Sequence, residues 1–151
     1  MKIKVKKLHP DAKIPTFSTE GAAGADLYAI ADSTLHKRSS NIIATYSGIS
    51  FVKTGIVIEI PKGYEGQIRP RSGLAFNHGI SIINTPGTID SDYRGEIAIA
   101  MINLGYVDYD ITAGDRIAQL VIKPVPVVTF EEVEELSETG RGDAGYGSTG
   151  K

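Results

Sequence analysis

The sequence has no cysteine, which excludes disulfides and any metal site built from thiolates. Its three histidines are scattered without the spacing of a metal-ligand motif. A formal net charge of −2 gives no electrostatic case for binding nucleic acid or an anionic membrane. No apolar run approaches the length of a membrane span, and residues 1–6 alternate rather than forming a signal core. We therefore expect a soluble protein of the cytoplasm or another intracellular compartment, without nucleic-acid or membrane partners.

A long helical periodicity is also lacking, and the pattern that replaces it has a period of two. Residues 2–6 alternate as a strand with one buried face does, and residues 55–60 and 116–122 are apolar runs bounded by turn residues. Pro70 must end a short run at 66–70 or place it on a sheet edge. A chain of 151 residues is most simply one domain with a sizeable core. We therefore predict an all-β fold of many short strands, arranged as a sandwich, jelly roll or barrel.

Three segments are predicted to lie outside the regular strands of the core. Residues 21–29 are rich in glycine and alanine, which suits close backbone packing around Asp26 better than a place in the core. Residues 32–50 are polar and are predicted to form an irregular loop, to which the sequence assigns no role. The acidic residues 131–135 are predicted to add a strand end or a short turn of helix.

The densest group of reactive side chains lies at residues 87–96, between strand-like runs at 80–84 and 96–103. Two carboxylates, a tyrosine ring and a guanidinium fall there between two glycines. Because β-branched runs flank the group, we predict that it sits at the mouth of a hairpin, where rigid strands can aim a carboxylate. A solvated acidic turn is the more ordinary interpretation of an isolated Asp-x-Asp pair. The remaining motifs favour a functional interpretation.

Other polar positions are ambiguous when taken singly. Ser72 and Gly73 precede a predicted helical turn at 74–78, where their backbone N–H groups suit an anion, although an ordinary N-cap is the commoner role. Gln119 interrupts an apolar strand, either as a structural hydrogen-bonding group or as a ligand contact. Asp26 suits either a turn or the neighbourhood of a metal ion.

Glycine dominates the end of the chain, which changes character at Gly140. Residues 140–151 cannot bury enough surface to order themselves, so we predict a domain at 1–139 and a flexible tail at 140–151. A tail without function is one possibility. The other is a nucleotide-binding role, because the tail combines a cation, a stacking ring, two hydroxyls and exposed backbone N–H groups. The residues concerned are Arg141, Tyr146, Ser148 and Thr149.

Five of these stretches resemble, in order and along essentially the whole chain, the five motifs of the trimeric deoxyuridine triphosphatase (dUTPase) family. One such match would be weak evidence, whereas five in sequence are hard to explain by coincidence. The resemblance implies a β-rich, jelly-roll-like subunit in a homotrimer, with each active site built from all three chains. The matching stretches are residues 23–27, 71–75, 87–96, 114–120 and 141–150.

The same resemblance implies hydrolysis of dUTP to dUMP and pyrophosphate, which keeps uracil out of DNA and supplies dUMP for thymidylate synthesis. Asp90 is then implied to accept a proton from a water that attacks the α-phosphorus in line. Mg²⁺ is implied on the triphosphate oxygens, contacted by Asp26 only through water. The implied phosphate contacts are Arg71, Ser72, Gly73 and Gln119.

The resemblance also implies how the nucleoside is recognised. A hairpin at 82–89 would hold the base, with Asn84 and exposed backbone groups copying a pairing edge that accepts uracil and mismatches cytosine. Thr88 and Ile89 lie in the same hairpin and are candidate contacts. Such a tight hairpin leaves no room for the thymine methyl group. Tyr93 would lie against the sugar, where an extra 2′-hydroxyl would clash, although packing within the hairpin is its more ordinary role.

In the tail, Tyr146 is implied to cover uracil. The terminal phosphates are implied to be contacted by Arg141, Ser148 and Thr149. Ala144 and Tyr146 stand where the family usually has glycine and phenylalanine. The tyrosine keeps a stacking face, whereas Ala144 narrows the freedom of the backbone in closing. The connection at 32–54 is longer than the family usually has. Two rival functions remain: a dCTP deaminase, which shares this fold and trimer but needs a different acid–base constellation, and a non-catalytic trimeric β module.

Overall fold

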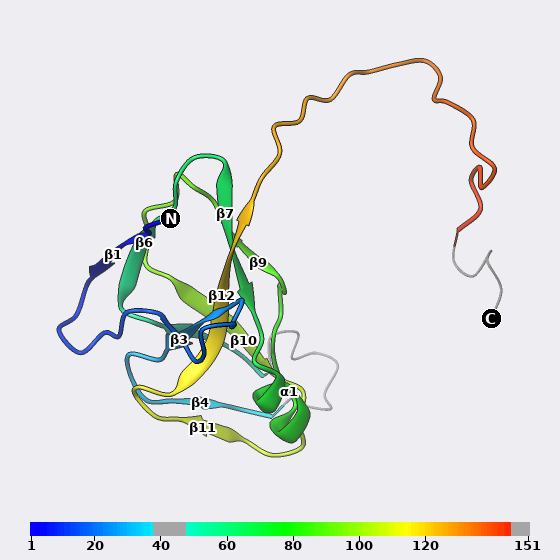
Figure 1. The fold of residues 1–151 in the computed structure, drawn as a ribbon. Helices are drawn as coiled ribbons and strands as arrows, with labels where there is room; N and C mark the ends of the chain where they lie inside the picture. The colour runs from blue at the N-terminus through cyan, green and yellow to red at the C-terminus, as the bar shows by residue number, and fades with distance from the viewer. Residues whose placement is uncertain (38–47, 146–151) are drawn as a thin grey trace.

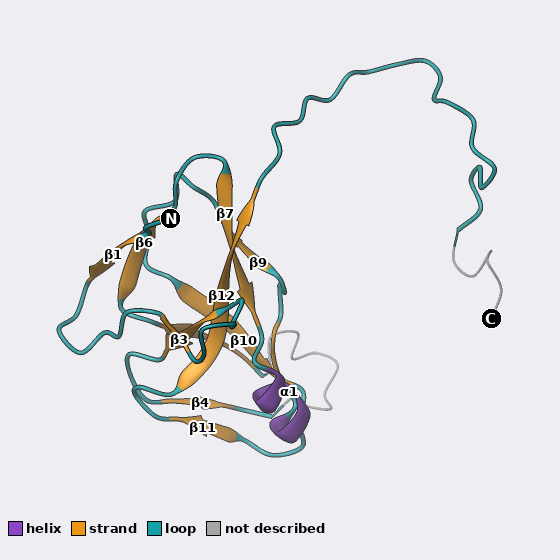
Figure 2. Ribbon diagram, viewed as in Figure 1, coloured by secondary structure: helices purple, strands orange, loops and turns teal. Residues whose placement is uncertain are grey.

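The computed structural model describes residues 1–37 and 48–145, in which twelve short strands and one helix follow one another (Figure 1). Strands dominate the body in Figure 2, which confirms the all-β prediction. The helix is α1 (Ser72–His78). The strands are β1 (Lys4–Lys7), β2 (Thr16–Phe17), β3 (Ala25–Tyr28), β4 (Ser33–Leu35), β5 (Ile49–Lys53), β6 (Ile56–Glu59), β7 (Tyr64–Arg69), β8 (Ile80–Ile82), β9 (Gly87–Ile89), β10 (Ala98–Asn103), β11 (Tyr109–Ile111) and β12 (Arg116–Pro124).

Antiparallel pairing joins these strands into two larger sheets and two strand pairs. One sheet has the order β2-β3-β12-β7-β9 and the other the order β5-β10-β8, while β1 pairs with β6 and β11 with β4. The chain therefore crosses repeatedly from one sheet to the other. Such crossing connections are typical of sandwich and jelly-roll architectures. Pro70 ends β7 at Arg69, as predicted, because proline cannot donate to the ladder.

The core is built from branched aliphatic side chains that come from different sheets. Leu27, Leu35, Ile56, Ile99 and Ile117 are each at most 1 % exposed and belong to one buried cluster. They lie on β3, β4, β6, β10 and β12, so a single core joins all the sheets. Because such interiors are close-packed, truncating one of these side chains to alanine would cost about 2–5 kcal/mol. The site described below is therefore mounted on a rigid frame.

The prediction that residues 21–29 stay out of the core is wrong in part. Leu27 and Ala29 are 1 % and 3 % exposed and belong to the buried cluster. Their small neighbours let the backbone approach β12 closely, since a Cβ added at Gly24 would lie 3.1 Å from the Cβ of Gln119. The predicted close packing is therefore real, and it brings this segment into the core instead of excluding it.

The irregular loop predicted at residues 32–50 is also corrected by the structure. Residues 33–35 form β4, residues 49–50 begin β5, and Leu35 is completely buried. Leu35 is hard to recognise as a core residue from the sequence, because the residues on both sides of it are polar. The part of the prediction that concerns residues 38–47 lies outside the described residues.

Beyond β12 the chain leaves the body and runs outward as an extended arm (Figure 1). Val125 is still held, because its N–H donates to the carbonyl oxygen of Gly63 at 2.9 Å. Residues 128–145 are exposed throughout and contain no helix or strand. The acidic residues 131–135 therefore form neither the strand end nor the helical turn that was predicted. No helix in the described part of the chain is long and apolar enough to cross a membrane.

Candidate active site

The cluster at residues 87–96 follows a crossover between the two larger sheets. β8 pairs with β10 in the three-stranded sheet, whereas β9 pairs with β7 in the five-stranded sheet. Residues 83–86 make the connection, with the N–H of Thr85 donating to the carbonyl oxygen of Ile82 at 3.3 Å. The hairpin predicted at 82–89 is therefore a tight turn between two sheets, because β8 and β9 have different pairing partners.

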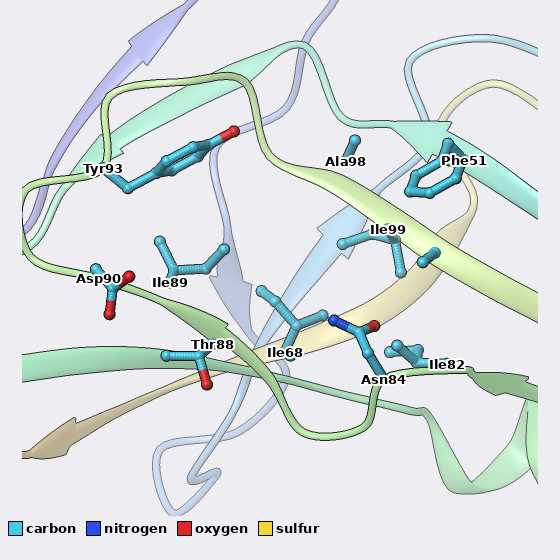
Figure 3. Close-up of a pocket in the computed structure, with 12 residues that line it drawn as sticks. Phe51, Ile68, Ile82, Asn84, Thr88, Ile89, Asp90, Tyr93, Ala98 and Ile99 are labelled. Carbon is cyan, nitrogen blue, oxygen red and sulfur yellow. The ribbon is translucent and has the colours of Figure 1, made fainter.

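A cavity of about 230 Å³ opens beside this turn (Figure 3). Side chains predicted from the sequence line it, and they come from the turn, from β9 and from the loop that follows β9. The structure thus brings together, at one hollow, residues that the sequence spreads over ten positions. They are Asn84, Thr88, Ile89, Asp90 and Tyr93.

Gly87 makes room for the amide of Asn84. A Cβ added at Gly87 would lie 3.2 Å from Asn84 Nδ2 and 3.4 Å from the Cβ of Ile68, so a side chain would press on both neighbours. Because Gly87 has no side chain, the amide of Asn84 can lie close to its backbone, at the wall of the cavity (Figure 3). An amide presents both a donor and an acceptor, which suits it to read a polar edge of a ligand.

The ring of Tyr93 is folded back onto its own loop. Its hydroxyl donates to the carbonyl oxygen of Glu96 at 3.1 Å, and its N–H donates to the carbonyl oxygen of Asp90 at 3.2 Å. A Cβ at Gly95 would clash with the ring, so this ring position requires glycine there. Tyr93 is 42 % exposed, which leaves part of the ring available to a ligand.

Asp90 is exposed at the junction of two hollows. One is the cavity just described, and the other is a broad groove of about 860 Å³ along residues 59–65, 90–92, 94 and 125–127. Within the residues that the structure describes, the carboxylate of Asp90 makes no hydrogen bond or ion pair. It can therefore accept a hydrogen bond from a water or a ligand. Arg94, by contrast, points into its own loop, where it donates to the carbonyl oxygens of Ser91 and Tyr93.

A second group of predicted residues gathers around Asp26 on β3, which is 2 % exposed. Its Oδ2 accepts hydrogen bonds from Ser18 Oγ at 2.8 Å and from Arg116 Nη1 at 3.2 Å. Arg71 Nε lies 3.2 Å from Oδ1, in an ion pair that lacks the alignment of a hydrogen bond. Arg71 Nη1 also donates to the carbonyl oxygen of Arg116 at 3.1 Å. Asp26 is thus the centre of an ion cluster rather than a simple turn former.

The charges of this cluster decide the protonation of Asp26. Burial by itself would raise the pKa of Asp26, because it disfavours the charged carboxylate. The hydrogen bonds from Ser18 and Arg116, with the charges of Arg71 and Arg116, outweigh burial and hold the pKa below its ordinary value. Asp26 is therefore ionised at neutral pH and matched by two guanidinium groups.

Oxygen ligands that could hold Mg²⁺ directly are sparse. The described part of the chain contains no group of three or more His, Cys, Asp or Glu side chains that could bind a metal ion. Asp26 offers a single carboxylate, and its Oδ1 is buried without a hydrogen-bond partner among the described residues. Mg²⁺ usually keeps several waters and takes one or two carboxylates together with substrate phosphates. This donor set fits contact with the ion through water, and it does not fit a cage built by the protein alone.

The start of α1 differs from the ordinary interpretation of its sequence. Arg71 occupies the N-cap position without a side-chain cap, and Ser72 is the first helical residue, so the N-cap role considered for Ser72 is wrong. Ser72 and Gly73 are exposed, and the first N–H groups of a helix lack partners within it. Gln119 is half-buried on β12, and its side chain makes no hydrogen bond to any described residue. The cavity beside Asp90 is lined by none of these residues within the described structure.

The structure describes only the first of the predicted tail residues. Arg141 is exposed on the arm, and its Nε donates to the carbonyl oxygen of Ala144 at 2.9 Å. This local turn lies far from β9, whose residues line the cavity (Figure 1). The predictions for Tyr146, Ser148 and Thr149 lie outside the described residues.

Sequence reasoning missed residues in both groups. Phe51 on β5 lines the cavity although it is 74 % exposed, and Ala98 and Ala100 on β10 line it as well. Phe51 lies opposite Ala100 in the strand pairing. That register depends on contacts between distant parts of the chain, and nothing local in the sequence announces it. Arg116, in contrast, carries a usable signal, because it is a lone guanidinium at the start of an apolar strand.

Comparison with known proteins gives the family. Residues 10–150 match the family model for dUTPase, so the chain belongs to the dUTPase family. A deoxyuridine 5′-triphosphate nucleotidohydrolase of Nautilia profundicola is 52 % identical over 151 residues, which is 100 % of both chains. One from Syntrophotalea carbinolica is 51 % identical over 148 residues, covering 98 % of this chain and 96 % of that protein.

Solved structures agree with this placement. A Staphylococcus bacteriophage 80alpha dUTPase with dUpNHpp superposes with a TM-score of 0.86 at 28 % identity, over 99 % of each chain. A mutant dUTPase from phage phi11 of S. aureus, with a coordinated structural Mg(II) ion, superposes with a TM-score of 0.78 at 25 % identity, over 91 % of this chain and 100 % of that one. The jelly-roll-like fold expected from the sequence is thereby confirmed.

Proposed function

We propose that this protein hydrolyses dUTP to dUMP and pyrophosphate, which keeps uracil out of DNA and supplies dUMP for thymidylate synthesis. The observation that carries the proposal is the gathering of Asn84, Asp90 and Tyr93 around one cavity in a chain of the dUTPase family. The activity in the names of its relatives supports the same reaction.

The turn between β8 and β9 selects the base. The amide of Asn84 and the backbone of the turn offer donors and acceptors that match the edge of uracil and mismatch that of cytosine. A base that leaves these polar groups unpaired is rejected more strongly than one that merely differs by a methyl group. Thr88 and Ile89 line the cavity, and the tight turn that precedes them excludes the methyl group of thymine.

Tyr93 selects the sugar. Its ring is fixed by the hydrogen bond to the carbonyl oxygen of Glu96 and by its position over Gly95. A fixed ring packs against the 2′-carbon of deoxyribose and clashes with a ribose 2′-hydroxyl. The enzyme therefore excludes UTP, and this exclusion depends on how firmly the loop holds the ring.

Asp90 supplies the chemistry. Its carboxylate accepts a proton from a water while the oxygen of that water attacks the α-phosphorus in line. The bond between the α-phosphorus and the oxygen that bridges it to the β-phosphorus then breaks, and pyrophosphate leaves. The exposure of Asp90 and its lack of partners among the described residues support this role, because the carboxylate is available to a water.

The triphosphate is held by the second group of residues. The N–H groups of Ser72 and Gly73 and the amide of Gln119 contact phosphate oxygens, and Arg71 adds positive charge. Asp26 would contact bound Mg²⁺ only through water. When bound, Mg²⁺ neutralises charge on the phosphate oxygens.

These two groups complete one site across subunits of a homotrimer. The second group does not line the described cavity of its own chain, which supports a site that takes its phosphate contacts from a neighbour. The flexible tail at 140–151, which follows the domain at 1–139, then closes over the nucleotide. Tyr146 covers uracil, and the terminal phosphates are contacted by Arg141, Ser148 and Thr149.

A product assay with all the deoxynucleoside triphosphates in ¹⁸O-labelled water tests the proposal. We expect turnover of dUTP alone, with the label in dUMP and with pyrophosphate as the second product. Label found only in the diphosphate product would show attack at the β-phosphorus and remove the role given to Asp90. Release of ammonia from dCTP would identify a deaminase. Nucleotide binding without turnover would identify a binding module.

A further inference from the structure

Glu96 links the loop that carries Asp90 and Tyr93 to a different part of the fold. Its Oε1 accepts a hydrogen bond from the N–H of Gly55 at 3.0 Å, and its Oε2 lies 3.3 Å from Lys53 Nζ. The Glu96 side chain is 22 % exposed, so the bond to Gly55 is shielded in part from water. These contacts join the loop to the turn between β5 and β6.

That turn is a rigid anchor. Thr54 is 1 % exposed, and its Oγ1 donates to the carbonyl oxygen of Ile97 at 2.7 Å. Gly55 has a φ of +69°, and a Cβ added there would lie 2.9 Å from the Cβ of Ala12. Backbone in that conformation and that space cannot move without disturbing the core, so a group bonded to it is fixed in place.

The backbone of Glu96 also holds the ring of Tyr93. The hydroxyl of Tyr93 donates to the carbonyl oxygen of Glu96. The other side-chain hydrogen bonds of the described loop, from Arg94 to Ser91 and Tyr93, stay inside the loop. Glu96 therefore connects the Tyr93 ring, through its carbonyl oxygen and its carboxylate, to the buried turn at Gly55, next to the backbone hydrogen bonds that Ile97 makes with Thr54 and Ile56.

We propose that Glu96 is a positioning residue that sets the selectivity of the site for deoxyribose by clamping the Tyr93 loop to the β5–β6 turn. It touches no substrate itself. The inference rests on the proposed function, because selectivity is measured as the ratio of kcat/KM for dUTP to kcat/KM for UTP. Without the clamp the ring of Tyr93 moves away from the 2′ position, and a ribose hydroxyl is tolerated.

The geometry separates the two features of the Glu96 side chain, its reach and its charge. The exposed ion pair with Lys53 contributes little, because Lys53 is 67 % exposed and water screens the pair. The bond to the N–H of Gly55 needs an acceptor at the end of a side chain of this length. Glu96→Gln keeps the reach and an acceptor without the charge, whereas Glu96→Asp keeps the charge without the reach. Lys53→Met removes only the exposed partner.

Selectivity is measured first on these three variants in the full-length protein. We expect Glu96→Asp to lower the ratio of kcat/KM for dUTP to that for UTP by about tenfold, because the shorter side chain leaves the N–H of Gly55 without its acceptor. Glu96→Gln and Lys53→Met should stay within about threefold of the unmodified protein. A merely structural residue would lower kcat/KM for both nucleotides equally, and an unchanged ratio in Glu96→Asp would overturn the proposal.

Amide hydrogen exchange supplies a test that does not depend on activity. In Glu96→Asp the hydrogen-bonded amides of Tyr93, Ile97 and Gly55 should exchange about tenfold faster, while those of β12 keep their protection. Unchanged exchange at Tyr93 and Ile97 would contradict the proposed clamp, even if the variant is an active enzyme. If the unmodified protein hydrolyses no dUTP, the proposed function fails, and the exchange experiment still decides whether Glu96 holds the loop.

Discussion

Two aspartates in this molecule have opposite surroundings. Asp90 is exposed beside a cavity, and its carboxylate has no partner among the described residues. Asp26 is 2 % exposed and is matched by Ser18 and two arginines. The first arrangement leaves a carboxylate available for chemistry, whereas the second uses a carboxylate to hold other groups in place. Exposure and partners, rather than residue type, therefore separate the proposed roles of these two residues.

The same contrast extends to the regions around them. The cavity near Asp90 is built by one chain from five strands and their connections. The ion cluster at Asp26 fixes Arg71 and Arg116 at the ends of β7 and β12, away from that cavity. Under the proposed function, the first region binds the nucleoside, and the second contacts its phosphates when a neighbouring subunit brings it to the cavity. Substitutions should therefore affect activity and stability differently in the two regions.

The largest effect is expected for Asp90→Asn, which keeps the shape of the side chain and removes the base. We predict a fall in kcat of about 10²- to 10⁴-fold, with KM for dUTP and the unfolding midpoint nearly unchanged. Steady-state kinetics and thermal unfolding check the two halves of this prediction. A variant that turns over at close to the original rate would place the base elsewhere, with Asp92 as the first residue to examine.

Removal of everything after Gly140 tests whether the tail completes the site. We expect a folded trimer whose kcat/KM for dUTP falls on the order of a hundredfold, because the charge-assisted contacts to phosphate are lost. Size-exclusion chromatography and kinetics measure the two properties. The remaining β domain should unfold at the same midpoint, since residues 128–145 are exposed and add little to it.

Mixing that truncated chain with the Asp90→Asn chain tests whether tails cross between subunits. In mixed trimers some sites combine an intact Asp90 with the intact tail of a neighbour, so part of the activity should return. If mixed trimers form and no activity returns, each tail serves the site of its own chain.

The parts that could be predicted from sequence are those governed by local chemistry. Alternation and β-branched runs predict the strands, and Pro70 ends β7 where a missing N–H must end it. The cluster of charges at residues 87–96 and the glycines around it are visible without a structure, because the tight packing of Tyr93 on Gly95 involves neighbours in sequence. Local sequence thus points to the cluster, whereas the role expected of Asp90 within it came from the resemblance to the dUTPase family.

The parts that could not be predicted depend on contacts between distant segments. Leu35 is the only apolar residue among residues 32–41, and only its pairing with Tyr109 shows that it lies on a strand. Arg71 and Arg116, which pair with Asp26, lie 45 and 90 positions farther along the chain. Phe51 reaches the cavity only through the register of β5 against β10. Each of these facts is set by tertiary packing rather than by local preference.

Asp26→Asn should reverse the pattern expected for Asp90 by reducing stability strongly at neutral pH. Two guanidinium groups lose their buried counter-charge, which costs about 3 kcal/mol in the free energy of unfolding.

The effect should depend on pH, because the pKa of Asp26 is lowered in the folded protein. The ionised form of Asp26 therefore adds stability at pH values above the unfolded value of 3.8, and this added stability is lost as the pH falls through the folded pKa. Urea unfolding should therefore show a gap between the two proteins that is constant above about pH 4 and narrows below it. A gap that does not depend on pH would mean that the charge of Asp26 contributes nothing.

The smallest effect is expected at Phe51, and it sharpens the description of the cavity. Phe51 is 74 % exposed on β5, opposite Ala100, and in Figure 3 it lies across the cavity from Tyr93. The small side chains of Ala98 and Ala100 leave space that the ring of Phe51 borders. Such an exposed ring adds little to folding, so Phe51→Ala should change the free energy of unfolding by less than about 0.5 kcal/mol.

A nucleoside that enters the cavity covers part of the ring, and loss of that apolar contact should raise KM for dUTP by about threefold to tenfold without changing kcat. Phe51→Leu, which keeps an apolar side chain, should recover most of the affinity. An unchanged KM in Phe51→Ala would show that the base does not reach this wall, and a smaller assembly on size-exclusion chromatography would assign the ring to a subunit contact instead.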